Sequence, residues 1–151
     1  METVQGQMTA AGNVIGVVVS RWNELVTKEL LAGCLEELEA HGKPEVVIIK
    51  VPGAWEIPMA AKALIEKRKT DGVVALGCIL QGATTHASML AGDTSSALMN
   101  LQMTTGKPIS WGILTPENQE QALERTGLKM GHKGREAAKA LIEVLSAIDQ
   151  L

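Results

Sequence analysis

The run from Val73 to Leu80 is apolar without interruption, and a loop of small residues that includes Gly82 follows it directly. A short apolar run between Asp71-Gly72 and a glycine-containing loop is typical of a strand buried on both faces of a sheet. The stretch 86–105 then predicts a helix. Ligands bind at the carboxyl ends of strands in open α/β sheets, and helix N-termini attract anions. The loop therefore predicts a phosphate-sized pocket with His86 beside it.

The rest of the chain alternates buried strands with helices. Further strands are predicted at 14–19, 46–51 and 109–114, and the strand described above spans 73–80. Apolar residues at helical spacing, with glycine and proline at the boundaries, predict further helices at 24–41, 58–69, 115–126 and 133–148. Alternating elements predict one α/β domain over 1–151, a flavodoxin-like three-layer α/β/α sandwich with a four-stranded parallel sheet.

The segment 1–12 has no partner strand in this scheme. Residues 3–8 alternate in polarity as an edge strand does. This N-terminal assembly strand either extends the edge of the sheet or reaches across to a neighbouring subunit.

Composition excludes several classes of protein. A net charge of -3 argues against a nucleic-acid surface, and the absence of any long uninterrupted apolar stretch argues against a membrane span. The N-terminus shows no signal-peptide pattern, so a cytoplasmic protein is expected. Cys34 and Cys78 fall on apolar faces and are expected to be reduced, buried and inert. The three histidines are scattered, and no metal site is predicted.

Candidate binding residues follow the predicted strands, where all the strand-to-helix loops share one end of the sheet. The chain has no Phe, no Tyr and only three Trp, and two of these, Trp22 and Trp55, lie in such loops. Flat rings at a polar rim suit a planar heterocycle. Glu56 is either an acceptor for ligand hydroxyls and N–H groups or a solvated first-turn carboxylate.

Cations and an imidazole complete the set of candidates. Arg125 and Lys133 flank a glycine-containing loop and either bind phosphate or are ordinary surface charges near helix ends. His86 is either a general acid/base or a helix-start residue with a solvent-exposed ring.

Five motifs in order carry a resemblance to one family. They are Ser20-Arg-Trp-Asn23, Val51-Pro-Gly-Ala-Trp-Glu-Ile-Pro58, Ala75-Leu-Gly-Cys-Ile-Leu-Gln-Gly-Ala-Thr-Thr-His86, Trp111-Gly-Ile-Leu-Thr115 and Glu120-Gln-Ala-Leu-Glu-Arg-Thr-Gly-Leu-Lys-Met-Gly-His-Lys-Gly134. Together they span nearly the whole chain, which resembles 6,7-dimethyl-8-ribityllumazine synthase, a transferase of riboflavin biosynthesis.

The resemblance implies a reaction that needs neither cofactor nor metal. The family condenses 5-amino-6-(D-ribitylamino)uracil with 3,4-dihydroxy-2-butanone 4-phosphate, through a Schiff base, elimination of phosphate and ring closure with loss of water. This is the penultimate step of riboflavin biosynthesis.

The resemblance also implies a role for each matched residue. His86 would be the proton-transfer residue. Trp111 and Lys133 would come from the adjacent subunit. The pyrimidine and the ribityl chain would be bound by Trp22, Asn23, Ala54, Trp55, Glu56, Ile79, Leu80, Trp111 and Lys133. The phosphate would be bound by Gly82, Ala83, Thr84, Thr85 and Arg125, with Arg125 as the main counter-charge.

The family's assembly gives the segment 1–12 a purpose. The resemblance implies homopentamers in which the N-terminal strand joins the neighbour's sheet, with an icosahedral 60-mer permitted by the short loop 128–133 and riboflavin synthase as a candidate partner.

The chain departs from the family at Gln81, at Ala87-Ser88-Met89 and at His132, which stands where Asn is common. The alternative is therefore a weakly active or inactive shell-forming or flavin-like ligand-binding relative. A monomeric flavodoxin-type electron carrier would leave Arg125 and Lys133 unexplained.

Overall fold

The computed structural model describes residues 1–82 and 85–151 and contains one four-stranded parallel sheet. The strands lie in the order β2-β1-β3-β4, so β2 and β4 form the two edges. Every pairing is parallel, as the alternation of strands and helices predicts. The strands are β1 (Val14–Ser20), β2 (Glu45–Val51), β3 (Gly72–Cys78) and β4 (Ile109–Leu114).

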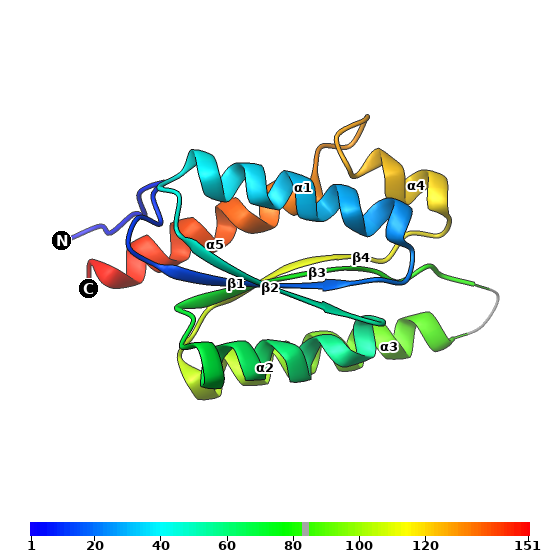
Figure 1. Ribbon diagram of the computed structural model, residues 1–151, viewed down its shortest axis with the longest axis horizontal. Coiled ribbons are helices and arrows are strands. Elements are labelled where there is room, and N and C mark those ends of the chain that lie inside the picture. The colour runs from blue at the N-terminus through cyan, green and yellow to red at the C-terminus, as the bar shows by residue number, and fades with distance from the viewer. Residues whose placement is uncertain (83–84) are drawn as a thin grey trace.

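Helices cover both faces of this sheet. On one face lie α1 (Glu24–Ala40) and α5 (Lys133–Asp149), and on the other lie α2 (Ile57–Arg68) and α3 (His86–Thr105) (Figure 1). A short 3₁₀ turn, η1 (Ala54–Glu56), precedes α2, and a short helix, α4 (Gln119–Glu124), precedes α5. The three-layer α/β/α sandwich expected from the sequence is confirmed.

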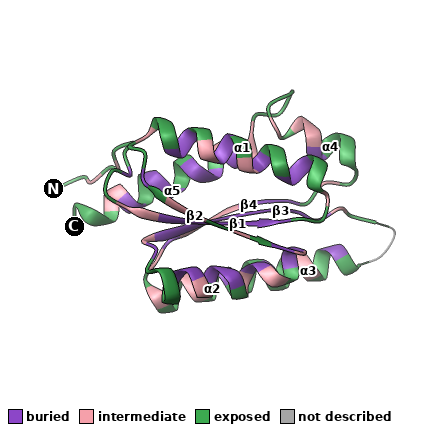
Figure 2. Ribbon diagram, in the orientation of Figure 1, coloured by how far each residue is buried: buried purple, intermediate pink, exposed green. Residues whose placement is uncertain are grey.

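Alternation along the strands builds two hydrophobic layers. Val17 and Leu76 pack toward α1 and α5, whereas Val18 and Ala75 pack toward α2 and α3. All of β3 is buried because it lies between two strands and two layers of helices (Figure 2). An uninterrupted apolar run is what such a strand requires.

Two predicted elements are shorter than expected. The strand predicted to reach Leu80 ends at Cys78. The helix predicted over 115–126 is confined to α4, and its N-cap is Asn118, whose Oδ1 accepts from the N–H of Gln121 at 2.9 Å. Thr115 is therefore not the cap. Its carbonyl oxygen instead accepts from Nε2 of Gln81 at 2.9 Å and extends the contact between the β3 and β4 ends.

The N-terminal segment forms no strand within this chain, so the first alternative, an extension of the chain's own sheet, is not realised over the described residues 1–12. The segment lies along α5 instead, where the N–H of Gln7 donates to Oγ of Ser146 at 2.8 Å. Its last turn is anchored by Ala10, which is buried and donates its N–H to the carbonyl of His41 at 2.8 Å. Over the two described ranges, none of the helices is long and apolar enough to cross a membrane.

Candidate active site

Trp22 lies at the carboxyl end of β1 and is exposed over 63% of its surface. A Cβ atom on Gly53 would lie 2.5 Å from Cε3 of Trp22, so the indole packs directly on the glycine backbone of the β2–α2 loop. The N–H of Trp22 donates to the carbonyl of Pro52 at 2.9 Å. The ring is thus held at a fixed place with a broad face open, as stacking on a planar ligand requires.

Asn23 is turned inward to the sheet. Its Nδ2 donates to the carbonyl oxygen of Cys78 at 3.0 Å. This side-chain bond replaces the ladder bond that the backbone N–H of Trp22 would make to β3, because that N–H donates to the carbonyl of Pro52 instead. The backbone of Asn23 is left-handed, with φ 64°, a conformation that Asn tolerates better than most residues. The side chain of Asn23 therefore stabilises the loop that carries Trp22.

The end of β3 presents a backbone acceptor. The N–H of Ile79 donates to the carbonyl of Leu114 at 2.8 Å, and the N–H of Gln81 donates to the carbonyl of Pro116 at 2.9 Å. Between them, the parallel ladder would direct the N–H of residue 116 at the carbonyl of Ile79, but proline has none. The carbonyl of Ile79 is thus released from the ladder, beside a half-buried Leu80.

The predicted phosphate loop is only partly described. Ala83 and Thr84 lie outside the described residues. Gly82 and Thr85 are exposed on either side of them, and a Cβ atom on Gly82 would meet nothing within 4 Å. His86 is exposed at the first position of α3, where the resemblance needs a proton-transfer group.

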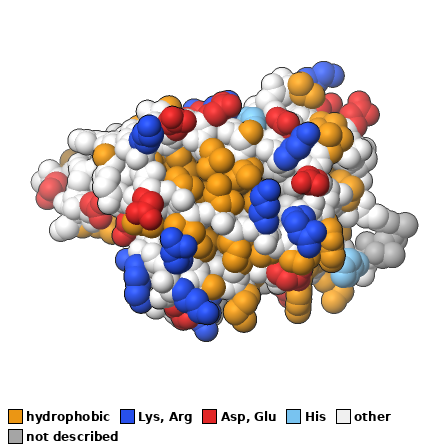
Figure 3. Space-filling view, viewed as in Figure 1, with side chains coloured by type: hydrophobic (Ala, Val, Ile, Leu, Met, Phe, Trp, Pro, Cys, Tyr) orange, Lys and Arg blue, Asp and Glu red, His pale blue; other side chains and the backbone are white. Residues whose placement is uncertain are grey.

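The β2–α2 loop divides its residues between core and surface. Ala54 is buried, whereas Trp55 is exposed over 68% of its surface. Oε1 of Glu56 accepts from the N–H of Gly53 at 3.1 Å, so the carboxylate braces the turn under Trp22. Trp55 and Glu56 also line a mainly apolar groove of about 690 Å³ between the β2 edge, α2 and α3. Figure 3 shows hydrophobic side chains gathered across the middle of one face, with Lys and Arg beside them.

A separate cavity lies at the outer edge of β4. It has a volume of about 530 Å³ and combines Trp111 with Arg125 and Lys133. The N–H of Lys133 donates to the carbonyl oxygen of Arg125 at 2.8 Å, which ties the two cations together through their backbones. Glu124 lines the cavity as well, so two cations stand against one carboxylate. An indole beside a net positive charge suits an anionic ligand with a flat part.

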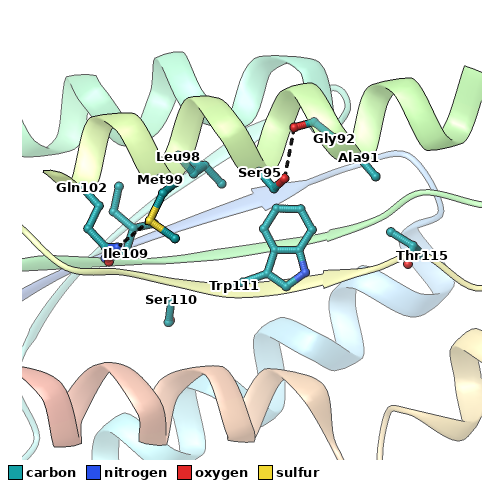
Figure 4. Close-up of a pocket in the computed structure, with 10 residues that line it drawn as sticks. All are labelled: Ala91, Gly92, Ser95, Leu98, Met99, Gln102, Ile109, Ser110, Trp111 and Thr115. Atoms are coloured by element: carbon teal, nitrogen blue, oxygen red, sulfur yellow. Dashed lines mark hydrogen bonds between the residues drawn. The ribbon is translucent and has the colours of Figure 1, made fainter. Parts of the chain in front are cut away.

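Trp111 also borders a second cavity, between α3 and β4. This one has a volume of about 510 Å³ and is lined by residues that include Leu98, Met99 and Ile109. Figure 4 shows the indole rising from β4 toward α3, while Ser110 lies on the opposite side of the strand. Trp111 therefore lies between two cavities, at an edge of the sheet that no strand formed by residues 1–82 or 85–151 covers.

The described site residues thus fall into two groups within one chain. Around the carboxyl ends of β1, β2 and β3 lie Trp22, Asn23, Ala54, Trp55, Glu56, Ile79, Leu80, Gly82, Thr85 and His86. Along the outer β4 edge lie Trp111, Arg125 and Lys133.

Sequence reasoning missed some lining residues of the cavity at the β4 edge. Gln121 lies there with Arg125, and a spacing of four residues on a helical pattern could have revealed this shared face. Met130 also lines the cavity, but no local signal marks it because the loop 127–131 has no periodic pattern.

Both cysteines belong to the core and not to this chemistry. They are free and buried, as the sequence predicts. Burial raises the pKa of Cys34 to about 12 and that of Cys78 to about 11. The thiols therefore stay protonated at neutral pH and are poor nucleophiles.

The chain is similar over its full length to proteins of one named family. Residues 12–149 match the family described as 6,7-dimethyl-8-ribityllumazine synthase. A protein of that name from Protochlamydia amoebophila (strain UWE25) is 40% identical, over 100% of this chain and 89% of the relative. Another, from Nitratidesulfovibrio vulgaris (strain DP4), is 37% identical, over 100% of this chain and 98% of the relative. The chain belongs to the 6,7-dimethyl-8-ribityllumazine synthase family.

Proposed function

We propose that this protein catalyses the condensation of 5-amino-6-(D-ribitylamino)uracil with 3,4-dihydroxy-2-butanone 4-phosphate to 6,7-dimethyl-8-ribityllumazine. The carrying observation is the cavity that joins Trp111 to Arg125 and Lys133, because a phosphorylated substrate reacting with a flat ring needs this combination. The family membership supplies the identity of the two substrates.

The first group of residues receives the pyrimidine. Trp22 offers the exposed face on which the ring stacks, and the carbonyl of Ile79, which the ladder leaves open, accepts from a ring N–H. Ala54 and Glu56 border the ribityl chain. Much of the rate enhancement comes from holding two reactants in contact.

The second reactant is bound through its phosphate. Arg125 is the main counter-charge, since a guanidinium binds phosphate through two parallel hydrogen bonds. We also assign Gly82, Ala83, Thr84 and Thr85 to phosphate binding, as the resemblance implies. His86 transfers protons during Schiff-base formation and elimination, a contribution of about 10²–10⁴ in rate.

The geometry favours a site shared by two subunits. Trp22 follows β1, whereas the cationic cavity opens on the outer edge of β4, with β3 between them. Strands lie about 4.8 Å apart, so these groups are separated by roughly 10 Å across the sheet. A neighbour that brings its own Trp111, Arg125 and Lys133 to the carboxyl ends of β1 and β3 closes this gap.

Such sharing fits assembly into homopentamers, with the icosahedral 60-mer as the larger form. The groove along the β2 edge, lined by Ile49, Val51 and Trp55, is open to an added strand, and the segment 1–12 of a neighbour is the strand we assign to it. Riboflavin synthase is the partner we expect to consume the product. We assign the enzyme to the cytoplasm, since free buried thiols suit a reducing compartment.

The alternative, an inactive shell or ligand binder, rests on Gln81 and on Ala87-Ser88-Met89. Gln81 has a structural task, because its amide and its N–H join the β3 end to Thr115 and Pro116. His86, Arg125 and Lys133 are all present, and the matching relatives are named as synthases. These points favour the active enzyme.

The test combines turnover with assembly. Purified protein is mixed with both substrates, and lumazine fluorescence and phosphate release are followed beside an enzyme-free control, while sedimentation reports the assembly. Catalysis by an oligomer is the expected result. A protein that assembles but gives no rate above the control would refute the assignment as an active enzyme and favour the alternative, an inactive shell-forming protein.

A further inference from the structure

His132 lies where the loop after Arg125 meets the helix that begins at Lys133. It directly precedes α5, and its backbone is extended. Its Nδ1 accepts a hydrogen bond from the backbone N–H of Arg135 at 3.2 Å, and its carbonyl oxygen accepts from the N–H of Glu136 at 3.0 Å. The imidazole thus caps the first turn of α5, where a helix leaves N–H groups unpaired.

The ring of His132 is also packed against α1. A Cβ atom on Gly33 would overlap the imidazole, so the ring lies directly on the backbone of that helix. One step further along, a Cβ atom on Gly134 would overlap the carbonyl oxygen of Leu30. Glycine at both positions lets α1 and α5 approach closely, with the ring held at their junction.

This junction controls the backbone of both cavity cations. Thr126 and His132 form an antiparallel bridge, and the N–H of Gly127 donates to the carbonyl of Gly131 at 2.8 Å. The next bond outward is the one from the N–H of Lys133 to the carbonyl of Arg125. The backbone positions of Arg125 and Lys133, which line the cavity with Trp111, therefore depend on the position of His132.

We propose, building on the proposed function, that His132 is a positioning residue for the phosphate substrate: its neutral ring clamps the start of α5 onto α1, and its protonation releases Lys133 and Arg125 from their binding geometry. A backbone N–H can only donate, so the cap requires a lone pair on Nδ1. A proton there would set donor against donor and place a positive charge at the positive end of a helix. Imidazole is the side chain whose charge changes between about pH 5 and 8.

The acidic groups of α1 nearest this junction are already engaged. Arg135 pairs with Glu36, and its Nη1 lies 3.2 Å from Oε1 of Glu37. Glu37 is also approached by Nδ1 of His41 at 3.2 Å and by Nζ of Lys139 at 3.9 Å. The other charged residues on these elements are Glu24, Lys28, Glu29 and Glu39 on α1, Glu120 and Glu124 on α4, Arg125 and Lys129 in the loop, and Lys133, Glu136, Glu143 and Asp149 on α5.

Two substitutions separate capping from charge. In His132→Asn, the side-chain oxygen can still cap the helix and carries no titratable group, whereas His132→Ala removes the cap. The KM for 3,4-dihydroxy-2-butanone 4-phosphate is measured at pH 8 and pH 5.5. The ratio of the wild-type KM to the Asn-variant KM at each pH cancels every effect that the two proteins share and so isolates His132.

At pH 8 the KM of the Asn variant is expected to lie within about twofold of the wild-type KM. The Ala variant is expected to have a KM about fivefold higher than the wild type with kcat nearly unchanged, because it has lost the cap. At pH 5.5 the wild-type KM is expected to exceed that of the Asn variant about fivefold, as if its cap were removed. A ratio that stays the same at both pH values, in a folded and assembled Asn variant, overturns the proposal.

A second readout needs no turnover. Binding of inorganic phosphate by wild type and His132→Asn is followed by calorimetry at the same two pH values. The proposal requires that acidification weakens binding more in the wild type. Equal weakening overturns it, whether or not the condensation is observed, so failure of His132 and failure of the enzyme assignment are distinguishable.

Discussion

The backbone N–H of Lys133 donates to the carbonyl oxygen of Arg125 at 2.8 Å, and both residues line the cavity beside Trp111. Seven residues separate them in the sequence. A loop closed by this bond places two cations at one end of a single pocket, and neither can shift without affecting the other. This pairing argues that Arg125 acts from the same subunit as Trp111 and Lys133.

Arg125→Ala is expected to raise the KM for the phosphorylated substrate about tenfold to a hundredfold, since a charge-assisted bidentate contact contributes about 1.5–3 kcal/mol. The KM for the aminouracil should change little. Steady-state kinetics with each substrate varied in turn measures this. Lys129→Ala is the matched control, because Lys129 is exposed on the same loop but does not line the cavity. An equal effect of both substitutions would contradict a specific role for Arg125.

His86→Ala is expected to lower kcat by about 10²–10⁴ while both substrates still bind, because the role we propose for this side chain is proton transfer and not substrate affinity. Single-turnover fluorescence, together with substrate titration, separates the two effects. An unchanged kcat with a raised KM would assign His86 to binding instead.

Asn23→Gly and Asn23→Ala test the link between β1 and β3. Both remove the hydrogen bond to Cys78 and should lower the free energy of unfolding by about 1 kcal/mol. The Ala variant should lose about 1 kcal/mol more, because alanine is disfavoured at φ 64° and glycine is not. Urea unfolding of both variants gives the comparison, and equal losses would mean that the left-handed backbone carries no cost.

Stability should fall at alkaline pH through the buried thiols. Because burial raises the pKa of Cys34 from 9.0 to about 12, the folded chain keeps this proton above pH 9 while the unfolded chain loses it. The thiol's contribution is therefore complete below pH 9 and declines between pH 9 and 12, by up to about 1.4 kcal/mol per pH unit.

Guanidinium unfolding between pH 7.5 and 10.5 checks this dependence. Cys34→Ala should have a shallower slope above pH 9 than the wild type, since only Cys78, with a pKa of about 11, then contributes. Parallel slopes would show that Cys34 gains access to solvent before it ionises.

Local pattern was enough to predict the sheet and most of its helices. The apolar run at β3 and the alternating periodicities fix which residues are buried, and burial dominates the stability of each element. The same pattern could not end β3 correctly. Ile79 and Leu80 are apolar, but the strand stops where its neighbours diverge: Trp22 turns toward Pro52, and Pro116 has no N–H to give. Cross-strand partners, not side-chain polarity, decide that boundary.

The helix expected at 115–126 failed for a similar reason. Thr115 followed by Pro116 satisfies every local rule for a helix start. In the fold, the carbonyl oxygens of both residues accept hydrogen bonds from Gln81, so the helix begins only after its N-cap at Asn118. A contact between residues more than thirty positions apart overrode the local preference.

The sequence by itself determined the layers, the chemistry available at the carboxyl end of the sheet and the family, because side-chain type and periodicity are local properties. Only the tertiary structure decided that the side chain of Asn23 donates to the carbonyl of Cys78 and that the ring of His132 packs on Gly33. It also decided that Trp111 shares a cavity with Arg125 and Lys133. These relationships depend on the close approach of distant segments, which side-chain pattern along the chain does not encode.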